Sequence, residues 1–452
     1  MSSFEDHGIV IASNLFRSDN PEERNAELFS VMLGSPVKGV RVQSMAGAGG
    51  FSGDMSRVWV TYADSGESEG ESESEGEQVM VMKHTKENGA ASSKALGLAR
   101  EGCFYRWVQS SRSSSNSSSS SSVYDALLPK IYYSKGDMVS GDKVILLEDL
   151  GSFVQTGYFF GGGSPLNWGR DLEKEVTDKG LSLGSANPGQ ITELVAEAAC
   201  LLAAKYHGEH WMRKDLLEGH EWLKASDWYV NKGEATWQGG QKYIKDAWNI
   251  LKTTKATTDN TDCIWSPYII GLIDASMNKI SWNAYQERIQ GSHFTLAHGD
   301  FHPANMMCSF DNAKLQAGCL TAEDIKMRLV DWEVVGVGSG AQDIGQYMMS
   351  HMAPEARRQC EDRLLKVYFD KLQASIAARD IQGVDIVAEG VEYTFEMCKR
   401  EYVYGGVERW MFLLVILANM CPDKMQQYFL DQVEAFALDH GVTAESIGMS
   451  RL

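Results

Sequence analysis

Two short polar motifs near residue 300 constrain this chain more than any other feature. The first is LAHGDFHPAN at residues 296–305, and the second is LVDWE at residues 329–333. Proline at position 303 favours a tight turn after the histidine that precedes it. The turn would let Asp300 face a cleft while Asn305 leads into a short strand. Asp331 follows at the end of an apolar, strand-like run.

These three side chains supply the oxygen atoms that ATP-dependent phosphoryl transfer requires. Asp300 would orient an acceptor hydroxyl and partly remove its proton. The amide oxygen of Asn305 and the carboxylate of Asp331 would hold Mg²⁺ against the phosphates. A buried turn with an unrelated surface aspartate is the alternative interpretation.

A glycine-rich turn lies between two expected strands, at residues 37–45 and 57–62. Glycine lets backbone N–H groups approach phosphate oxygens without interference from a Cβ atom. An ordinary hairpin explains the same composition. The residues that we expect to bind nucleotide in this turn are Gly47, Gly49, Gly50, Ser52 and Gly53.

The next expected strand, at residues 78–83, ends in Lys83. An ammonium group at this point would reach the α- and β-phosphates of a bound nucleotide. A solvated lysine at a strand end is the alternative. A helix is expected at residues 92–109, with an apolar stripe and with Glu101 inside it.

Together, HGDxHxxN and DWE resemble the catalytic and metal-binding loops of the aminoglycoside phosphotransferase and choline kinase superfamily. The resemblance is strongest to its CHK kinase-like (ecdysteroid-kinase-like) branch of small-molecule kinases. It implies that Asp300 is the catalytic base and that Asn305 and Asp331 are Mg²⁺ ligands. It also implies that Glu101 pairs with Lys83, although a solvated helix face would carry such a glutamate too.

The resemblance extends to two further segments. Residues 144–150, with the sequence VILLEDL, resemble the hinge between kinase lobes, where the backbone at Glu148, Asp149 and Leu150 would bond the adenine edge. A buried strand that ends in a turn would look the same. Asp343 corresponds to a residue that braces the catalytic loop, and it is also placed to cap a helix N-terminus.

The expected fold is α+β, a bilobal protein-kinase-like fold. A nucleotide-binding lobe at residues 1–150 would hold a small antiparallel sheet and one helix. A mainly α-helical catalytic and substrate lobe would follow at residues 151–452. Tracts rich in Glu and Ser, at about 64–77, and in Ser, at about 110–122, cannot bury apolar surface and are expected to be disordered inserts.

The composition limits the classes of partner that the protein is expected to bind. A net charge of −19 disfavours nucleic acid and anionic membrane surfaces as main partners. No apolar run is long enough to span a membrane. The eight cysteines are scattered without CxxC pairs, which indicates reduced thiols in a cytoplasmic protein.

The sequence thus predicts an ATP- and Mg²⁺-dependent phosphotransferase that acts on a hydroxyl of a small molecule. A nucleotide-binding pseudokinase scaffold is the alternative, and a protein kinase is disfavoured because HGD and DWE replace HRD and DFG. The acceptor could be choline-like, an aminoglycoside or an ecdysteroid-like alcohol. A cationic acceptor could bind a group of acidic and aromatic residues, namely Glu333, Glu401, Glu408, Tyr402, Tyr404 and Trp410, although surface charge and core packing explain these residues as well.

Overall fold

The computed structural model describes residues 21–45, 53–63, 77–86, 89–114, 123–182, 188–257, 263–290, 292–379 and 392–448. The chain divides into two compact units. Unit 1 comprises Met1–Gly151 together with Val330–Val335, and unit 2 comprises Ser152–Leu329 together with Gly336–Leu452. The expected inserts at 64–77 and 110–122 fall largely outside the described residues.

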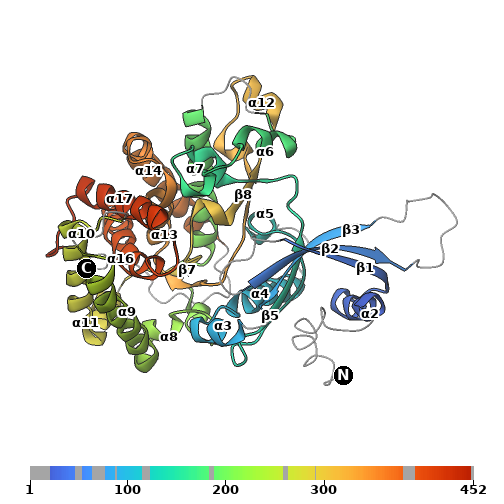
Figure 1. Cartoon of the computed structure of the whole chain (residues 1–452), viewed down its shortest axis with the longest axis horizontal. Helices are drawn as coiled ribbons and strands as arrows, with labels where there is room; N and C mark the ends of the chain where they lie inside the picture. Colours follow the sequence, from blue (N-terminus) through green and yellow to red (C-terminus); the bar gives the residue numbers. More distant parts are fainter. Residues whose placement is uncertain are drawn as a thin grey trace. The chain divides into compact units, whose positions relative to one another are not determined.

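Unit 1 contains a five-stranded antiparallel sheet with the order β1-β2-β3-β5-β4 (Figure 1). Its strands are β1 Val37–Ser44, β2 Gly53–Tyr62, β3 Gln78–Thr85, β4 Ile131–Gly136 and β5 Lys143–Glu148. Alternating side chains divide between the two faces of such a sheet. One face packs on helix α2 (Pro21–Leu33), and its core includes Met80 and Met82 of β3.

Lys83 must therefore point to the opposite face of the sheet from Met80 and Met82. Lys83 pairs in register with Ile145 of β5, and Lys143 lies two residues before Ile145. The two lysines consequently share a face. Helix α4 (Arg100–Ser114) packs against the neighbouring strand β4.

The helix expected at residues 92–109 is in fact two helices, so that prediction was wrong in detail. Helix α3 (Ala90–Leu96) ends at Gly97, which has a φ of 68° and caps the helix, and α4 begins at Arg100. A left-handed residue cannot continue an α-helix, and glycine adopts this conformation without steric penalty. The break places Glu101 in the first turn of α4. A further short helix, α5 (Val123–Leu127), precedes β4.

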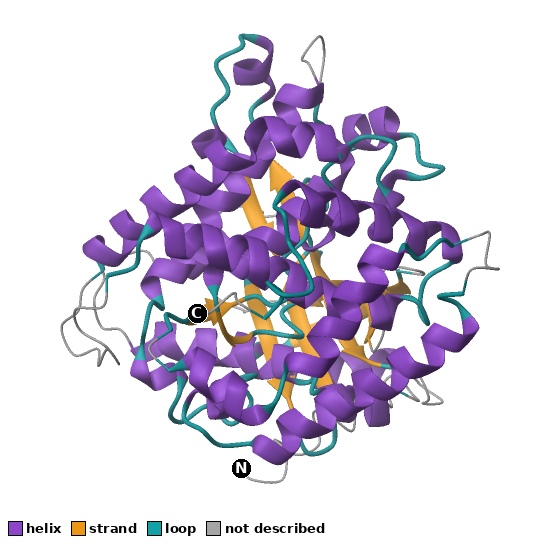
Figure 2. Cartoon of the chain, turned by 90° about the vertical axis from the view of Figure 1, so that its left-hand side faces the viewer, coloured by secondary structure: helices purple, strands orange, loops and turns teal. Residues whose placement is uncertain are grey.

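Unit 2 is mainly helical, and its described residues form more helices than strands. Helices also make up most of the view in Figure 2. Its long helix α7 packs along α14, and the last helices, orange to red in Figure 1, lie together. Its α-helices are α6 Leu172–Asp178, α7 Pro188–Glu209, α8 Ser226–Tyr229, α9 Glu234–Thr254, α10 Pro267–Lys279, α11 Trp282–Ile289, α12 Asn312–Gln316, α13 Gly340–His351, α14 Pro354–Ala378, α15 Phe395–Arg400, α16 Gly406–Leu417 and α17 Asp423–Asp439. A π-helical turn, η6 (Glu401–Gly405), joins α15 to α16.

Short strands of unit 2 precede and follow each of the two sequence motifs. Strand β7 (Thr295–Ala297) leads into the first motif and pairs with β10 (Gly336–Gly338). Strands β6 (Val154–Gln155), β8 (Met306–Ser309) and β9 (Lys326–Leu329) form a second small sheet. Because β8 leaves the first motif and β9 leads to the second, this sheet fixes where the first loop ends and where the second begins. The short 3₁₀ turns of this unit are η1 Thr156–Phe160, η2 Pro165–Asn167, η3 Lys214–Leu216, η4 Pro303–Asn305 and η5 Ala322–Asp324.

The predicted α+β class is confirmed, as are the N-terminal antiparallel sheet and the mainly helical remainder. Within the ranges given above, no helix has both the length and the apolar character needed to cross a bilayer. All eight cysteines are described, and each is a free thiol.

Candidate functional site

In unit 1, Lys83 lies at the centre of a cluster of carboxylates. Its Nζ is 2.8 Å from Glu101 Oε2, 2.8 Å from Asp331 Oδ1 and 3.0 Å from Glu333 Oε1. Burial lowers the pKa of Lys83, but the three carboxylates outweigh burial and hold this pKa well above its ordinary value. Lys83 therefore carries a permanent positive charge, and its predicted partner Glu101 is in direct contact with it.

A second lysine in this cluster was missed by the sequence reasoning. Lys143 Nζ lies 2.6 Å from Glu101 Oε2 and 2.5 Å from Glu333 Oε1, and its side chain has no exposed surface. In the sequence, Lys143 begins an apolar strand and resembles a solvated end residue. Lys83 pairs with Ile145, two residues after Lys143, so knowledge of this register would have shown that both lysines lie on one face of the sheet.

The DWE segment belongs to unit 1 and is anchored there by its tryptophan. Trp332 is fully buried and stacks on Phe104 of α4, with ring centroids 4.3 Å apart and planes inclined by 19°. Asp331 has a φ of 64°, a conformation uncommon for a residue other than glycine. The stacked ring on one side and the ion pairs on the other hold this turn in place.

The three carboxylates around Lys83 are close enough together to share one cation, and in this structure that cation is Lys83 Nζ. One oxygen from each of Glu101, Asp331 and Glu333 lies within 4.8 Å of the others. Oxygen donors are the ligands that Mg²⁺ prefers. Asp331 is the most accessible of the three, with 31% of its side chain exposed against 1% for Glu101 and 13% for Glu333.

Tyr105 lies one helical turn after Glu101 and is fully buried. Among the described residues its hydroxyl has no hydrogen-bond partner. Burial raises the pKa of Tyr105, and the nearby carboxylates of Glu101 and Asp331 raise it further. The hydroxyl therefore stays protonated and neutral beside the charged cluster.

In unit 2, the first motif forms a turn around Asp300. Asn305 Nδ2 donates to the Asp300 main-chain oxygen at 3.0 Å and to Asp300 Oδ2 at 3.2 Å. These bonds leave the amide oxygen of Asn305 as its remaining acceptor. His302 Nδ1 accepts the N–H of Ala304 at 3.3 Å, and its Nε2 lies 3.3 Å from Asp300 Oδ2 and 3.2 Å from Asn305 Nδ2.

The Asp300 carboxylate is partly accessible, with 37% of its side chain exposed. Burial raises the pKa of Asp300, but His302, Arg409 and His298 outweigh that effect, and the pKa of this carboxyl is lowered. Asp300 is consequently ionised at neutral pH. A carboxylate of low pKa is a weak base but a good acceptor for a substrate hydroxyl.

Asp343 braces this turn from helix α13. It accepts the N–H of His298 at 2.7 Å and the N–H of Gly299 at 3.2 Å. The expectation that Asp343 caps a helix was wrong, because Ser339 is the residue at the N-cap of α13. The bracing role that the family resemblance implied is confirmed by these two bonds.

Gln346, which the sequence reasoning did not single out, also contacts Asp300. Its Nε2 donates to Asp300 Oδ1 at 2.9 Å, while its Oε1 accepts from Arg409 Nε at 2.6 Å. Gln346 lies one turn after Asp343 on α13, so both residues face the same motif. An (i, i+3) search from Asp343 could have found it.

The expected nucleotide-binding segments are only partly described. Gly47, Gly49, Gly50 and Ser52 lie outside the described residues. Gly53 begins β2 beside Lys83, where an added Cβ atom would lie 3.3 Å from Lys83 Cε. The side chains of the expected hinge are engaged within unit 1, since Glu148 Oε2 accepts the N–H of Lys130 at 3.0 Å and Asp149 Oδ2 lies 2.7 Å from Arg57 Nε.

The three glutamates considered for a cationic acceptor are each engaged in other contacts. Glu333 pairs with the two lysines in unit 1. In unit 2, Glu401 accepts from Tyr393 at 2.9 Å and Glu408 lies 3.5 Å from Arg288 Nη1. Core packing and ion pairs account for these glutamates.

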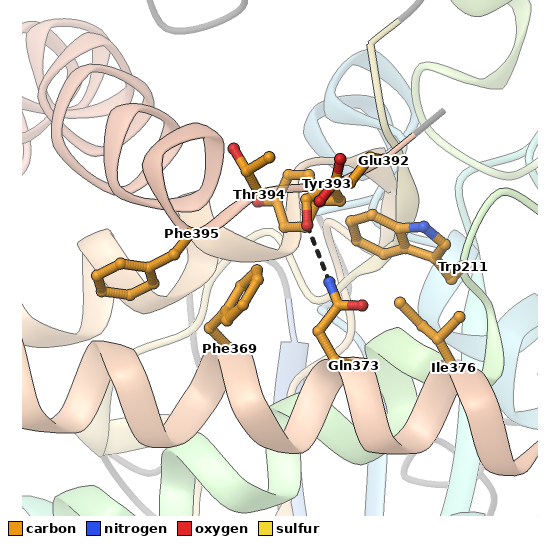
Figure 3. Close-up of a pocket in the computed structure, with 8 residues that line it drawn as sticks. All are labelled: Trp211, Phe369, Gln373, Ile376, Glu392, Tyr393, Thr394 and Phe395. Carbon is orange, nitrogen blue, oxygen red and sulfur yellow. Dashed lines mark hydrogen bonds between the residues drawn. The ribbon is translucent and has the colours of Figure 1, made fainter. Parts of the chain in front are cut away.

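A separate pocket of about 500 Å³ lies in unit 2 between the C-terminal half of α14 and the start of α15 (Figure 3). Gln373 Nε2 donates to the main-chain oxygen of Tyr393 at 3.1 Å across it. None of the predicted site residues lines this pocket. Its lining residues are Trp211, Phe369, Gln373, Ile376, Glu392, Tyr393, Thr394 and Phe395.

The described elements are those of an α+β protein with an N-terminal antiparallel sheet and a mainly helical remainder. The family whose model matches the chain is the ecdysteroid kinase-like family, over residues 231–380. This segment contains both sequence motifs and Asp343, whereas Lys83 and Glu101 lie outside it. The match confirms the predicted resemblance to ecdysteroid-kinase-like proteins over this segment.

Three solved structures are also similar. A choline kinase from Cryptosporidium parvum Iowa II has 9% identity and a TM-score of 0.44, with 91% of this chain and 93% of that chain covered. An ethanolamine kinase from Plasmodium vivax has 9% identity and a TM-score of 0.39, with 91% and 84% covered. A spectinomycin phosphotransferase in complex with ADP and spectinomycin has 10% identity and a TM-score of 0.31, with 92% and 100% covered. None of the curated proteins compared matches the chain.

Proposed function

We propose that this protein is an ATP- and Mg²⁺-dependent phosphotransferase that phosphorylates a hydroxyl group of a small molecule in the cytoplasm. The observation that carries the proposal is the convergence of Lys83, Glu101 and Asp331 in unit 1. These residues come from a strand, a helix and a distant loop. Their convergence supports the role that kinases give to a lysine, its glutamate partner and a metal-binding aspartate.

The side chains of unit 1 would bind the nucleotide. Lys83 would donate to the α- and β-phosphates while Glu101 fixes its position. The glycine-rich turn around Gly53 would cover the phosphates, and the backbone from Glu148 to Leu150 would bond the adenine. Asp331 would share the metal with Asn305, and a bound Mg²⁺ would neutralise negative charge on the transferring phosphoryl group.

In unit 2, Asp300 would accept a hydrogen bond from the acceptor hydroxyl and hold it in line for attack. Its lowered pKa supports a positioning role over early proton removal. A positioning role for Asp300 is consistent with a loose transition state, in which little proton transfer has to precede bond formation. His302, Asn305 and Gln346 would keep the carboxylate in one orientation.

The acceptor belongs to the same proposal. The match to the ecdysteroid kinase-like family supports an alcohol as the phosphate acceptor. We include choline-like amino alcohols, aminoglycosides and steroid alcohols as the classes to be screened. The glutamates first considered for a cationic acceptor are held in other contacts, so they add no support for one class over another.

The test is a screen of these acceptors with labelled ATP, with Asp300→Asn as the blank. Asp300→Asn should lower kcat by about 10³-fold or more. Its affinity for Mg·ATP, measured by calorimetry, should stay within a few-fold of wild type. Asp246→Asn, which changes an exposed aspartate on α9, is the control and should leave both quantities unchanged.

Two outcomes would contradict the proposal. Equal turnover by Asp300→Asn and wild type would exclude the assigned role of Asp300. Binding of Mg·ATP without phosphoryl transfer to any acceptor in the panel would favour the pseudokinase scaffold.

A further inference from the structure

The buried lysine of β5, Lys143, has no part in the roles assigned above. Its side chain is completely buried, and its Nζ contacts Glu101 at 2.6 Å, Glu333 at 2.5 Å and the main-chain oxygen of Leu98 at 3.4 Å. A lysine is rarely buried so completely unless opposite charges surround it. Its position therefore depends on the carboxylates of this cluster.

Lys143 contacts the same carboxylate oxygens that Lys83 contacts. Glu101 Oε2 lies 2.6 Å from Lys143 and 2.8 Å from Lys83. Glu333 Oε1 lies 2.5 Å from Lys143 and 3.0 Å from Lys83. Each of these two glutamates therefore retains one lysine partner if Lys83 moves away.

Binding of a nucleotide would require Lys83 to move in this way. Under the proposed function, its ammonium stays with Glu101 and turns from Asp331 and Glu333 toward the phosphates. Taking a cation away from a buried carboxylate is strongly unfavourable. Without Lys143, the movement of Lys83 away from Glu333 would therefore be opposed.

We propose that Lys143 is a positioning residue for nucleotide binding, which neutralises Glu333 and so releases Lys83 from Glu333 for the phosphates, while Glu101 still holds Lys83 in place. This inference rests on the proposed function. It assigns Lys143 no contact with ATP or with the metal. It explains why this cluster holds two lysines where the lysine–glutamate pair of kinases needs one.

The test compares the affinities of wild type and Lys143→Met for Mg·ATP by calorimetry. The variant removes the charge and keeps a side chain of similar length, so we expect Kd to rise at least tenfold. Thermal unfolding without nucleotide establishes that the variant is folded. Lys135→Met, which changes a lysine of β4 that has no ion pair among the described contacts, is the matched control and should bind as wild type does.

The double variant Lys143→Met with Glu333→Gln separates this role from simple packing. Removing one carboxylate restores the balance of charges in the cluster, so Kd should return to within about threefold of wild type. A double variant that binds as weakly as Lys143→Met would overturn the inference. So would a folded Lys143→Met protein with wild-type affinity.

The single variant Glu333→Gln tests the proposed role of Lys143 if Lys143→Met does not fold. It relieves Lys83 of one carboxylate, so Mg·ATP should bind about threefold more tightly, and weaker binding would contradict the inference. If wild type itself fails to bind Mg·ATP, the proposed function fails. If wild type binds and Lys143→Met binds equally, the role of Lys143 alone is refuted.

Discussion

Asp331 and Lys83 form a direct ion pair, with 2.8 Å between Oδ1 and Nζ. Under the proposed function these two side chains serve the metal and the phosphates, so the pair must separate when Mg·ATP binds. Asp331→Asn should then lower the affinity for ATP in Mg²⁺ at least tenfold. Without metal, affinity should be unchanged or higher, because Lys83 loses one competing carboxylate.

Calorimetric titration of Asp331→Asn with ATP, once in Mg²⁺ and once in EDTA, measures both effects. Asp178→Asn, which changes an exposed aspartate paired with Lys174, is the control. If added Mg²⁺ strengthens ATP binding to Asp331→Asn as much as it does for wild type, Asp331 is not a metal ligand.

Gln346 connects Arg409 to Asp300, and its loss should affect catalysis more than nucleotide binding. Gln346→Leu removes the donor at 2.9 Å from Asp300 Oδ1, so the carboxylate can rotate away from the acceptor hydroxyl. We expect kcat to fall about tenfold, which corresponds to about 1.4 kcal/mol in the barrier. The Kd for Mg·ATP should not change.

Gln342→Leu is the matched control for Gln346→Leu. Gln342 lies one turn earlier on α13 and donates to the Gly405 main-chain oxygen at 2.8 Å, away from Asp300. A comparable loss of kcat in both variants would indicate a general disturbance of α13. This outcome would contradict a specific role of Gln346 in orienting Asp300.

Tyr105 carries a buried hydroxyl without a partner among the described residues, so removal of this hydroxyl should not lower the free energy of unfolding. Tyr105→Phe should leave the free energy of unfolding unchanged or raise it by up to about 1 kcal/mol. Tyr368→Phe is the comparison, because the Tyr368 hydroxyl lies 3.0 Å from His207 Nδ1 and should contribute about 1 kcal/mol. Urea denaturation of the two variants measures the difference, and equal losses would show that a water molecule satisfies Tyr105 in solution.

Much of the fold follows from local patterns in the sequence. The strands of unit 1 have apolar residues at a spacing of two, and the long helices of unit 2 have them at a spacing of three to four. Strands β1, β2 and β3 lie where strands were expected, at residues 37–45, 57–62 and 78–83. The break at Gly97 was missed because the expected helix rested on an apolar stripe that lies wholly after this glycine. A glycine that follows Lys94 in a last helical turn is nevertheless a recognisable stop signal.

The candidate site was predictable only where one motif contains its residues. Asp300 and Asn305 lie within one turn, so their spacing in sequence already fixes their contact. Contacts of Asp331 and Glu333 with lysines of β3 and β5 depend on sheet register and on how α4 packs, which no single segment encodes. The contact of Lys83 with Glu101 came from the family resemblance, whereas that of Lys143 with Glu333 had no such guide.

A last prediction concerns acid stability and the ion-pair cluster around Glu361 in unit 2. Glu361 Oε2 lies 2.7 Å from Arg357 Nη1, 3.0 Å from the Tyr402 hydroxyl and 3.3 Å from His440 Nε2. Burial raises the pKa of Glu361, but His440 and Arg357 outweigh it, so the pKa in the folded protein is below the ordinary 4.5. The unfolded chain therefore takes up a proton at this residue more readily than the folded protein does.

The sign of the effect follows from this difference. The stabilisation by ionised Glu361 is complete above pH 4.5 and is lost as the pH falls from 4.5 through the lowered pKa. Glu361→Gln should lower the free energy of unfolding at pH 7 by roughly 2–3 kcal/mol, because Arg357 loses its buried partner. Its Tm should also fall less steeply than that of wild type on acidification below pH 4.5. Glu355→Gln, an exposed change on the same helix, should keep the wild-type slope, and an equal slope for Glu361→Gln would refute the assignment.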